Sequence, residues 1–485
     1  MQNETRSITR RSFLKGSALA ALAAGWNPRS WAQAAGANAD IRVAVVGFGG
    51  RGGDHIKSFS ETAGVRLVAL CDCDQKILDG AAKKLAEKGA PVRTYTDYRR
   101  LLEDKEVDVI SCATPNHWHS LNVVWACQAG KDVYVEKPVS HNVWEGRKAV
   151  EAARKYGRIV QSGTQSRSSR EGIAAAVEWV RAGNLGKIKV SRGLCYKRRA
   201  SIGKVDGPQP IPPEVDYDLW CGPALKLPLM RKRLHYDWHW VWNTGNGDLG
   251  NQGIHEMDVA RWFLGVTELS PRVLAVGGRL GYVDDGETPN TMVILHDYPG
   301  APILYEVRGL PAGKDVEGMD KYKGASIGIV IECEGGHVTV PSYTSATAYD
   351  RDGKEIKKWS GAEDHYGNFI KAVRSRKTED LYADILEGHL SSALCHTGNV
   401  SYLLGAARRP GEIKEAIAAD RGLAEAFDRM LEHLAANGVV LETEMATLGV
   451  PLKMDPRTER VLDNEQANAL LTRNYRAPFV VPDRV

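Results

Sequence analysis

The sequence predicts an α/β protein that contains two kinds of sheet. In the first third of the chain, short apolar segments typical of buried strands alternate with helix-length intervals, which indicates a parallel sheet with right-handed crossovers. Further along, strand-like segments follow one another without regular helices between them, which favours a largely antiparallel sheet. The first set covers 41–46, 65–70, 107–113 and 132–135, and the second covers 187–197, 272–280, 291–296, 303–308, 326–332 and 337–340.

Length and composition are those of a globular protein with several domains. The 485 residues correspond to roughly three domains, and 43% hydrophobic with 26% charged residues is an ordinary balance. The formal net charge is +4, and residues 1–34 alone carry five basic side chains against one acidic side chain. The rest of the chain is therefore close to neutral, and nucleic-acid binding by bulk electrostatics has no support.

The N-terminus has the features of an export signal. Arg10-Arg11-Ser12-Phe13-Leu14-Lys15 precedes a short apolar run over 16–25, and Ala32-Gln33-Ala34 is a candidate cleavage site. The run is too short to cross a bilayer of about 30 Å, so we expect no membrane insertion. The segment resembles a twin-arginine (Tat) signal, which implies export of an already folded protein to the bacterial periplasm. We assign 1–34 to this signal peptide.

A glycine-rich turn follows the first predicted strand. The pattern Gly-x-Gly-x-x-Gly comes directly after 41–46, and Asp72 lies 20 residues beyond its last glycine. In dinucleotide-binding folds such glycines let backbone N–H groups approach a pyrophosphate, and the acidic residue binds ribose hydroxyls. Because Asp72 would repel a 2′-phosphate, NAD is favoured over NADP. The candidate cofactor-binding residues here are Gly47, Phe48, Gly49, Gly50, Arg51, Gly52 and Asp72.

Two polar segments, 114–119 and 136–138, follow later strands of the same predicted sheet. Ligands of such sheets bind beyond the carboxyl ends of the strands, so both segments are predicted to face the cofactor. His117 and His119 are also a candidate metal pair, but no carboxylate or third histidine lies near them, which favours a role in the cofactor loop and predicts no metal site. The candidate cofactor-binding residues are Thr114, Pro115, Asn116, His119, Glu136 and Lys137.

The motifs Gly-x-Gly-x-x-Gly, Thr-Pro-Asn and Glu-Lys-Pro, in this order and at these strand ends, resemble those of the Gfo/Idh/MocA oxidoreductases, such as glucose–fructose oxidoreductase and inositol dehydrogenase. The placement of Glu136-Lys137-Pro138 is the most specific element, and the resemblance extends over about 40–405. It implies an N-terminal Rossmann domain and a C-terminal α/β domain whose open, largely antiparallel sheet faces the nicotinamide. We place these domains at 40–165 and 166–410, followed by a C-terminal extension at 411–485.

A later glycine-rich loop leads into a predicted helix with three polar side chains on one face. Asn251, its candidate N-cap, is spaced i, i+4, i+7 with His255 and Asp258. The family pattern has an aspartate four residues before a histidine, and both act on the substrate proton with the lysine of Glu-Lys-Pro. His255 and Lys137 match that pattern. Asn251 departs from it, because an amide orients a hydroxyl but exchanges no proton at neutral pH.

Lys137, His255 and Asn251 are therefore the predicted catalytic residues. Oxidation of a secondary alcohol requires a base for the hydroxyl proton while a hydride reaches the nicotinamide, and histidine suits that step. Lys137 is suited to stabilise an alkoxide, or to act as the base if burial lowers its pKa. The alternatives are a surface lysine and a structural histidine. We expect Asp258 to orient its neighbours rather than to catalyse.

Tryptophans gather in one part of the second half of the chain, where five of the twelve fall between 220 and 262. Aromatic faces pack on the C–H faces of sugar rings, which favours a carbohydrate cleft, although packing in a domain core explains them equally well. The candidate substrate-binding residues are Arg167, Tyr196, Tyr236, Trp238, His239 and Asp258.

The C-terminal extension is predicted to contain one amphipathic helix over 412–437 and a polar, proline-containing tail. We expect it to pack on the body of the protein or on a second subunit. The open sheet that the resemblance implies favours a homodimer or a homotetramer.

Two classes of function fit these residues. Because the periplasm has no free NAD pool, the first is a redox-neutral NAD(P)-dependent oxidoreductase that keeps its cofactor and acts on a sugar or cyclitol hydroxyl. The second is an NAD-dependent glycoside hydrolase or lyase that acts by transient C3 oxidation and elimination. A non-catalytic sugar-binding sensor is weaker, since it would be expected to lose Lys137 or His255.

Overall fold

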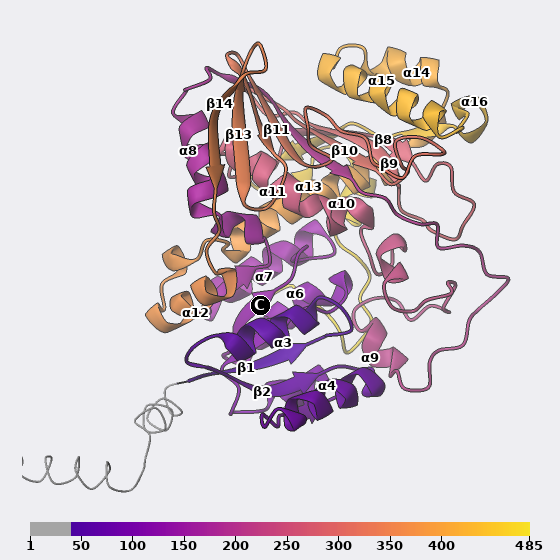
Figure 1. The fold of residues 1–485 in the computed structure, drawn as a ribbon. Helices are drawn as coiled ribbons and strands as arrows, with labels where there is room; N and C mark the ends of the chain where they lie inside the picture. Colours follow the sequence, from indigo (N-terminus) through magenta and orange to yellow (C-terminus); the bar gives the residue numbers. More distant parts are fainter. Residues whose placement is uncertain (1–39) are drawn as a thin grey trace, which may run out of the picture.

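The first sheet has the strand order of a dinucleotide-binding fold. The computed structural model describes residues 40–485, so the predicted signal peptide lies outside the described residues. Six parallel strands pair in the order β3-β2-β1-β4-β5-β6, which confirms the predicted parallel sheet (Figure 1). The strands are β1 (Ile41–Val46), β2 (Val65–Cys71), β3 (Arg93–Tyr95), β4 (Val109–Cys112), β5 (Asp132–Val135) and β6 (Val160–Ser162).

Helices cover both faces of this sheet, and the central strand shows why. In β1, Val43 packs with Phe59 of α3, whereas Ala44 on the opposite face packs in the cluster that contains Val123 of α6. Apolar side chains on both faces of a strand are typical of a parallel sheet between two helical layers. The covering helices are α3 (Gly52–Glu61), α4 (Gln75–Glu87), α5 (Tyr98–Leu102), α6 (His119–Gln128), α7 (Val143–Lys155) and α12 (His365–Ser375).

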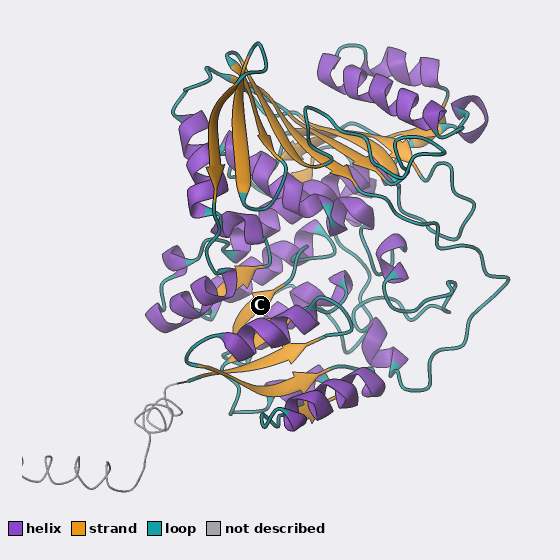
Figure 2. Cartoon of the chain, viewed as in Figure 1, coloured by secondary structure: helices purple, strands orange, loops and turns teal. Residues whose placement is uncertain are grey.

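The second sheet is mostly antiparallel, as predicted. Its strands run in the order β14-β13-β12-β11-β7-β10-β9-β8-β16-β15, and β7 and β10 form a parallel pair within it. One face packs on the helices α8 (Ala175–Arg181), α11 (Gly253–Leu264) and α13 (Ile385–Leu403) (Figure 2). The strands are β7 (Ile188–Tyr196), β8 (Arg272–Gly278), β9 (Thr291–His296), β10 (Ile303–Arg308), β11 (Ile327–Cys333), β12 (Gly336–Val340), β13 (Ser345–Asp350), β14 (Glu355–Ser360), β15 (Ala406–Arg408) and β16 (Ala446–Leu448), with β17 (Leu452–Asp455) and β18 (Arg460–Val461) attached beside β8.

The strand order ends at β14 on one side and at β15 on the other, so the sheet is open as predicted, but part of its other face is covered. Two helices, α14 (Pro410–Ile417) and α15 (Arg421–Ala436), lie over β8–β10, where Phe427 packs against Leu295 and Leu304 (Figure 1). They replace the single helix predicted over 412–437. The chain turns between them at Asp420, whose carboxylate pairs with Arg272 of β8 at 2.6 Å.

The C-terminal tail returns to the first domain. After α16 (Leu441–Glu444) and α17 (Glu465–Leu470), the Tyr475 hydroxyl donates to Glu145 of α7 at 2.9 Å, and Phe479 packs on Trp118 with ring centroids 5.5 Å apart. Val485 reaches the core cluster of the parallel sheet. Across residues 40–485, no helix is long and apolar enough to cross a membrane.

Candidate active site

A cavity of about 700 Å³ lies at the carboxyl ends of the parallel strands, between the two domains. The glycine-rich turn and the residues after β2, β4 and β5 form one wall. The opposite wall comes from α10 (Gly247–Asn251), the start of α11, and the segment 197–246, which connects β7 to α10. Both domains therefore contribute to a single site.

The glycine-rich turn has the shape that a dinucleotide requires. Gly47 has φ +75°, and a Cβ added there would lie 2.8 Å from backbone atoms of Thr114. A Cβ on Gly52 would lie 2.1 Å from the Gly47 carbonyl oxygen, whereas a Cβ on Gly50 would meet no atom within 4 Å. The turn is closed toward the protein and open toward the cavity at the N-terminus of α3, so these residues fit a pyrophosphate.

Asp72 is held at the cavity wall by backbone groups. Its carboxylate accepts hydrogen bonds from the N–H groups of Phe48 and Asp74, each at 3.0 Å, and burial raises its pKa. Two other predicted cofactor residues, Phe48 and Gly52, do not line the cavity. The Phe48 ring packs in the core with Leu70, so only its backbone faces the turn.

The polar segment after β4 divides between the cavity and the protein interior. Thr114, Pro115, Asn116 and His119 line the cavity. The ring nitrogens of His117 instead lie 3.3 Å from the Thr244 carbonyl oxygen and 3.0 Å from that of Trp220, and burial lowers its pKa to about 3. Both histidine rings contact backbone carbonyls, and the part of the chain that the structure describes holds no cluster of metal-ligating side chains.

Lys137 projects across the cavity to the second domain. Its Nζ donates to the Asn251 carbonyl oxygen at 3.0 Å and lies 3.5 Å from Asn251 Oδ1. Burial lowers the pKa of the amine, although the negative charge of Glu136 opposes this shift. The peptide bond between Lys137 and Pro138 is cis. The structure thus places Lys137 as a buried amine rather than as a surface lysine.

Glu136 contacts side chains of the first domain. Its Oε1 lies 3.1 Å from Nε2 of His55 and accepts from Nε of Arg51 at 3.4 Å. Burial alone would raise the Glu136 pKa, but His55, Lys137 and Arg51 outweigh it and hold the pKa below its ordinary value. Glu136 therefore stays charged and binds His55 and Arg51, and it does not act as a proton donor.

Asn251 and His255 both line the cavity, as their i, i+4 spacing predicts. Asn251 is not an N-cap, however, because the helix begins earlier, at Gly247, and Asn251 is the last residue of α10. His255 lies in the first turn of α11, its ring 4.7 Å from that of Tyr343. Burial holds its pKa well below the ordinary value, so the ring is neutral.

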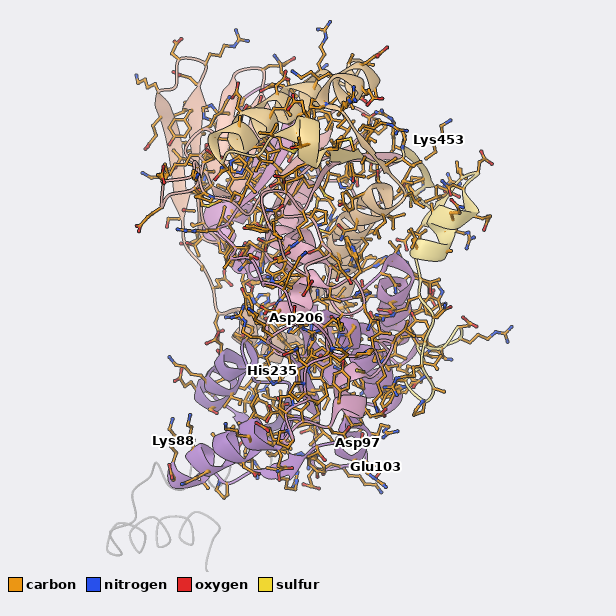
Figure 3. The ribbon with its side chains drawn as sticks, turned by 90° about the vertical axis from the view of Figure 1, so that its right-hand side faces the viewer. Lys88, Asp97, Glu103, Asp206, His235 and Lys453 are labelled. Carbon is orange, nitrogen blue, oxygen red and sulfur yellow. The ribbon has the colours of Figure 1, made fainter. Side chains whose placement is uncertain are left out.

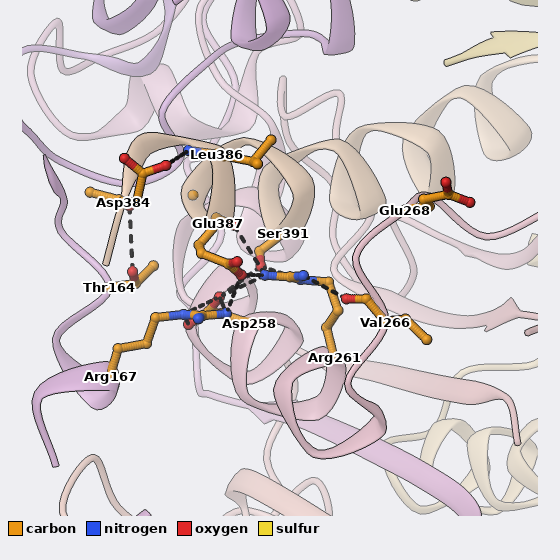
Figure 4. Close-up of polar contacts among 12 residues, drawn as sticks. Thr164, Arg167, Asp258, Arg261, Val266, Glu268, Asp384, Leu386, Glu387 and Ser391 are labelled. Carbon is orange, nitrogen blue, oxygen red and sulfur yellow. Dashed lines mark hydrogen bonds and ion pairs between the residues drawn. The ribbon is translucent and has the colours of Figure 1, made fainter. Parts of the chain in front are cut away.

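Asp258 and Arg167 do not line the cavity, which corrects their predicted substrate role. Figure 4 shows that they face each other instead. Arg167 Nε donates to Asp258 at 2.8 Å, and Arg167 NH2 lies 2.9 Å from Glu387. Arg261 and Ser391 complete this buried cluster. The charges of Arg167 and Asp258 thus face each other inside the second domain and not the cavity.

Tyr196 also lies away from the cavity. Its hydroxyl donates to Glu306 at 2.6 Å on the face of the sheet that α15 borders. Side chains alternate along a strand, so the next residue, Lys197, enters the cavity instead. The prediction that Tyr196 binds the substrate was therefore wrong by one position along the chain.

Three predicted substrate residues do line the cavity: Tyr236, Trp238 and His239. The rings of Trp238 and His239 stack with centroids 3.6 Å apart, and burial lowers the pKa of His239 to about 3. The Tyr236 hydroxyl accepts from Arg199 at 2.7 Å. An aromatic surface with neutral polar groups beside it is suited to a sugar ring.

Sequence reasoning missed several residues that the folded chain brings to the cavity. Lys197 Nζ donates to Gln252 Oε1 at 2.7 Å, and Gln252 donates in turn to the Tyr343 hydroxyl at 2.9 Å. Only Gln252 adjoins a recognisable motif. The other missed residues come from loops, strand ends and short helices: Gln165, Lys197, Arg199, Trp220, His235 and Tyr343.

The segment 197–246 crosses from the second domain onto the first, where α9 (Tyr217–Cys221) packs. Asp216 N–H donates to the Cys73 carbonyl oxygen at 2.9 Å, and His235 Nε2 lies 3.1 Å from Asp74. Figure 3 shows His235 and Asp206 of this segment between the two domains. The segment therefore closes one side of the cavity.

Fold and cavity together define a two-domain oxidoreductase with an NAD-binding Rossmann domain. A family model described as "Oxidoreductase family, NAD-binding Rossmann fold" matches residues 41–164, and one described as "Oxidoreductase family, C-terminal alpha/beta domain" matches 178–297. These two models cover about half of the chain. The chain belongs to the Gfo/Idh/MocA oxidoreductase family.

Curated relatives match only part of the chain. A glycosyl hydrolase family 109 protein from Shewanella sp. (strain W3-18-1) is 34% identical over 118 residues, 23% of this chain and 26% of that protein. A second such protein, from Shewanella baltica (strain OS155), has the same values. The match therefore spans about a quarter of the length of these relatives.

Solved structures share the fold over most of their length. The WlbA dehydrogenase from Bordetella pertussis, in complex with NADH and UDP-GlcNAcA, is 22% identical with a TM-score of 0.53, covering 73% of this chain and 94% of that chain. A levoglucosan dehydrogenase in complex with NADH and levoglucosan is 17% identical with a TM-score of 0.54, covering 73% and 95%.

Proposed function

We propose that the protein oxidises a secondary hydroxyl of a sugar or cyclitol with a tightly held NAD, in a reaction that is redox-neutral overall. The observation that carries this proposal is the convergence of Lys137, Asn251 and His255, from both domains, in one cavity with the glycine-rich turn. When bound, NAD supplies hydride transfer at the carbon that bears the hydroxyl.

Lys137 and His255 are suited to move the hydroxyl proton. Burial favours the neutral form of the Lys137 amine, which accepts the proton from the substrate oxygen. His255 is neutral, and its Nδ1 has no hydrogen-bond partner within residues 40–485, so the ring is free to exchange that proton. Asn251 holds the Lys137 amine through its carbonyl oxygen and orients the hydroxyl without gaining or losing a proton.

NAD is proposed rather than NADP because of Asp72. Its carboxylate lies at the cavity wall, where it is suited to accept hydrogen bonds from ribose hydroxyls and would repel a 2′-phosphate.

Retention of the cofactor is supported by the segment 197–246 and the C-terminal tail. Trp118 Nε1 donates to the Leu219 carbonyl oxygen at 3.0 Å, and Arg476 donates to Asp218 at 2.8 Å. Leu219 and Trp220 line the cavity, so the tail holds a cavity wall in place. A retained cofactor suits a periplasmic protein, the location that we propose from residues 1–34.

The alternative is an NAD-dependent glycoside hydrolase or lyase. Oxidation at C3 would acidify the C2 proton, the aglycone would leave by elimination, and C3 would be reduced again. The glycosyl hydrolase family 109 relatives support this alternative, and Lys137 and His255 supply the two proton-handling groups that it needs. A sugar-binding sensor is the weaker alternative, since it has no use for either group.

A homodimer or homotetramer remains a prediction from the family resemblance. The helices α14 and α15 cover the part of the sheet face over β8–β10, which leaves the rest of that face for such an interface. Light scattering on the purified protein would measure the mass of the assembly.

The deciding experiment uses the purified mature protein with no added cofactor. Absorbance at 340 nm is recorded while free sugars and then p-nitrophenyl glycosides are supplied. A 340 nm change with free sugars and no nitrophenol supports sugar oxidoreduction. Nitrophenol release without net NADH supports the glycosidase. Absence of bound nucleotide, with none taken up, overturns both.

A further inference from the structure

Two lysine side chains, Lys137 and Lys197, lie in the part of the cavity that Asn251 and Gln252 line, and neither has a carboxylate partner in the described part of the chain. Lys197 Nζ donates to the Gln252 side-chain oxygen at 2.7 Å, and Lys137 Nζ donates to Asn251. Within residues 40–485, neither lysine forms an ion pair with a carboxylate. Both line the same cavity and are close enough for the charge of Lys197 to lower the pKa of Lys137.

The three nearby carboxyl groups form no ion pair with Lys137 or Lys197. Asp248 binds Arg199 through two hydrogen bonds, at 2.9 and 2.6 Å, and so neutralises that guanidinium. Glu136 is held by His55 and Arg51. Glu256 accepts from Gln252 at 3.0 Å and forms no ion pair with either lysine, and burial raises its pKa to about 8, which favours its uncharged form at pH 7.

The phosphates of a dinucleotide do not account for Lys197. They belong at the glycine-rich turn, on the opposite wall, where backbone N–H groups serve them. Lys197 instead joins Gln252, which follows Asn251, and through Gln252 the Tyr343 hydroxyl. Its ammonium therefore lies on the wall that carries Asn251 and His255, across the cavity from the glycine-rich turn.

An ammonium group in a confined site is stabilised by a bound anion, and such a pair discriminates between charged and neutral ligands. We propose that the substrate is an anionic carbohydrate, whose carboxylate, phosphate or sulfate group is bound by Lys197. Lys137 then contacts the reacting hydroxyl, while Gln252 and Tyr343 hold Lys197 in place. This inference rests on the proposed function and narrows its substrate class.

The test measures ligand binding by the intrinsic fluorescence of the purified protein with its bound nucleotide, since Trp220 and Trp238 line the cavity. The ligands are glucuronate, galacturonate, glucose 6-phosphate and glucose 6-sulfate, with glucose and galactose as neutral counterparts. We expect at least one charged sugar to bind about tenfold more tightly than its neutral counterpart. The carboxylate, phosphate and sulfate arms identify which oxyanion the site prefers.

Three variants assign the preference to Lys197. Lys197→Gln should weaken binding of the charged sugar about tenfold and leave the neutral sugar within about twofold. Lys197→Arg should restore most of the difference, because it keeps the charge. Lys189→Gln removes an exposed lysine of β7, the strand that precedes Lys197, and should change neither affinity. Equal affinity for charged and neutral sugars, or an equal loss for both in Lys197→Gln, overturns the proposal.

Binding is measured without turnover, so the two proposals fail separately. A charged sugar that binds through Lys197, but produces neither a 340 nm change nor glycoside cleavage, supports the substrate class and refutes the catalytic function. Turnover of a neutral sugar, with no preference for charged ligands, refutes the substrate class alone.

Discussion

At the scale of single residues, burial decides the chemistry of the site. Lys137 and His255 carry ordinary side chains, yet both have pKa values lowered by burial, which favours their neutral forms. A neutral amine and a neutral imidazole accept protons, whereas the charged forms do not. Glu136 shows the opposite result, because its hydrogen bonds and neighbouring cations outweigh burial and keep it charged.

Lys137→Met should separate catalysis from cofactor binding. Because the Lys137 pKa is lowered from 10.5, kcat/KM should rise with pH as the neutral amine forms. The variant should lose about 10²–10⁴-fold in kcat together with this rising limb, while its nucleotide content stays unchanged. Lys189→Met is the matched control. A variant that keeps the wild-type pH profile would refute Lys137 as the base.

Glu256 should make stability depend on pH. Its folded-state pKa is about 8, against 4.5 for the ordinary group, so the folded protein binds this proton more tightly than the unfolded chain. The stabilisation is complete below pH 4.5 and is lost as pH rises through 8, a change on the order of a few kcal/mol. In Glu256→Gln, the free energy of unfolding in urea should fall less between pH 5 and 8.5. Equal losses in both proteins would contradict the shift.

At the scale of elements, register and helix breaks decide which side chains reach the cavity. In β7, Tyr196 points to one face of the sheet and the next residue, Lys197, enters the cavity. The break between α10 and α11 lets Asn251 and His255 face Lys137, while Asp258 turns into the second domain. Of the three residues that the sequence places on one helical face, Asn251 and His255 line the cavity and Asp258 forms a buried ion pair.

Arg167→Met tests the structural role of that inner face. Removing Arg167 leaves the buried carboxylate of Asp258 with only the more distant cation of Arg261, at 3.8 Å, so the free energy of unfolding should fall by up to about 3–5 kcal/mol. The KM of the remaining folded enzyme should stay unchanged, because Arg167 does not line the cavity. The double variant Arg167→Met with Asp258→Asn should recover part of the stability. A raised KM without loss of stability would return Arg167 to the substrate site.

At the scale of the whole molecule, the C-terminal extension ties the two domains together. Its helices α14 and α15 cover the second sheet, and its last residues pack on α6 and α7 of the first domain. Between these contacts the tail holds α9, whose Leu219 and Trp220 line the cavity. The two ends of the extension therefore contribute to different parts of the fold.

Loosening the tail should release the cofactor. In the double variant Arg476→Ala with Phe479→Ala, the contacts to Asp218 and Trp118 are lost. We expect bound nucleotide to dissociate about tenfold faster or more, which corresponds to about 1.4 kcal/mol, measured by dilution and nucleotide fluorescence. Val480→Ala, at a half-exposed position of the same tail, is the control. Unchanged dissociation would show that the tail does not control retention.

The features that depend on a few neighbouring residues could be predicted from the amino-acid sequence. The parallel and antiparallel sheets follow from local apolar patterns, and the cofactor cradle follows from glycines at fixed spacing, because hydrogen bonding and side-chain alternation act over short stretches. Lys137, Asn251 and His255 were identifiable because each belongs to a short motif.

Contacts between residues that are far apart in the sequence became known from the folded structure alone. Arg167 faces Asp258, Lys197 and Tyr343 enter the cavity, and α14 and α15 cover the part of the second sheet over β8–β10. These contacts join residues tens to hundreds of positions apart, where no local pattern records the partner. Burial then set the pKa values, since desolvation depends on every segment that packs around a group.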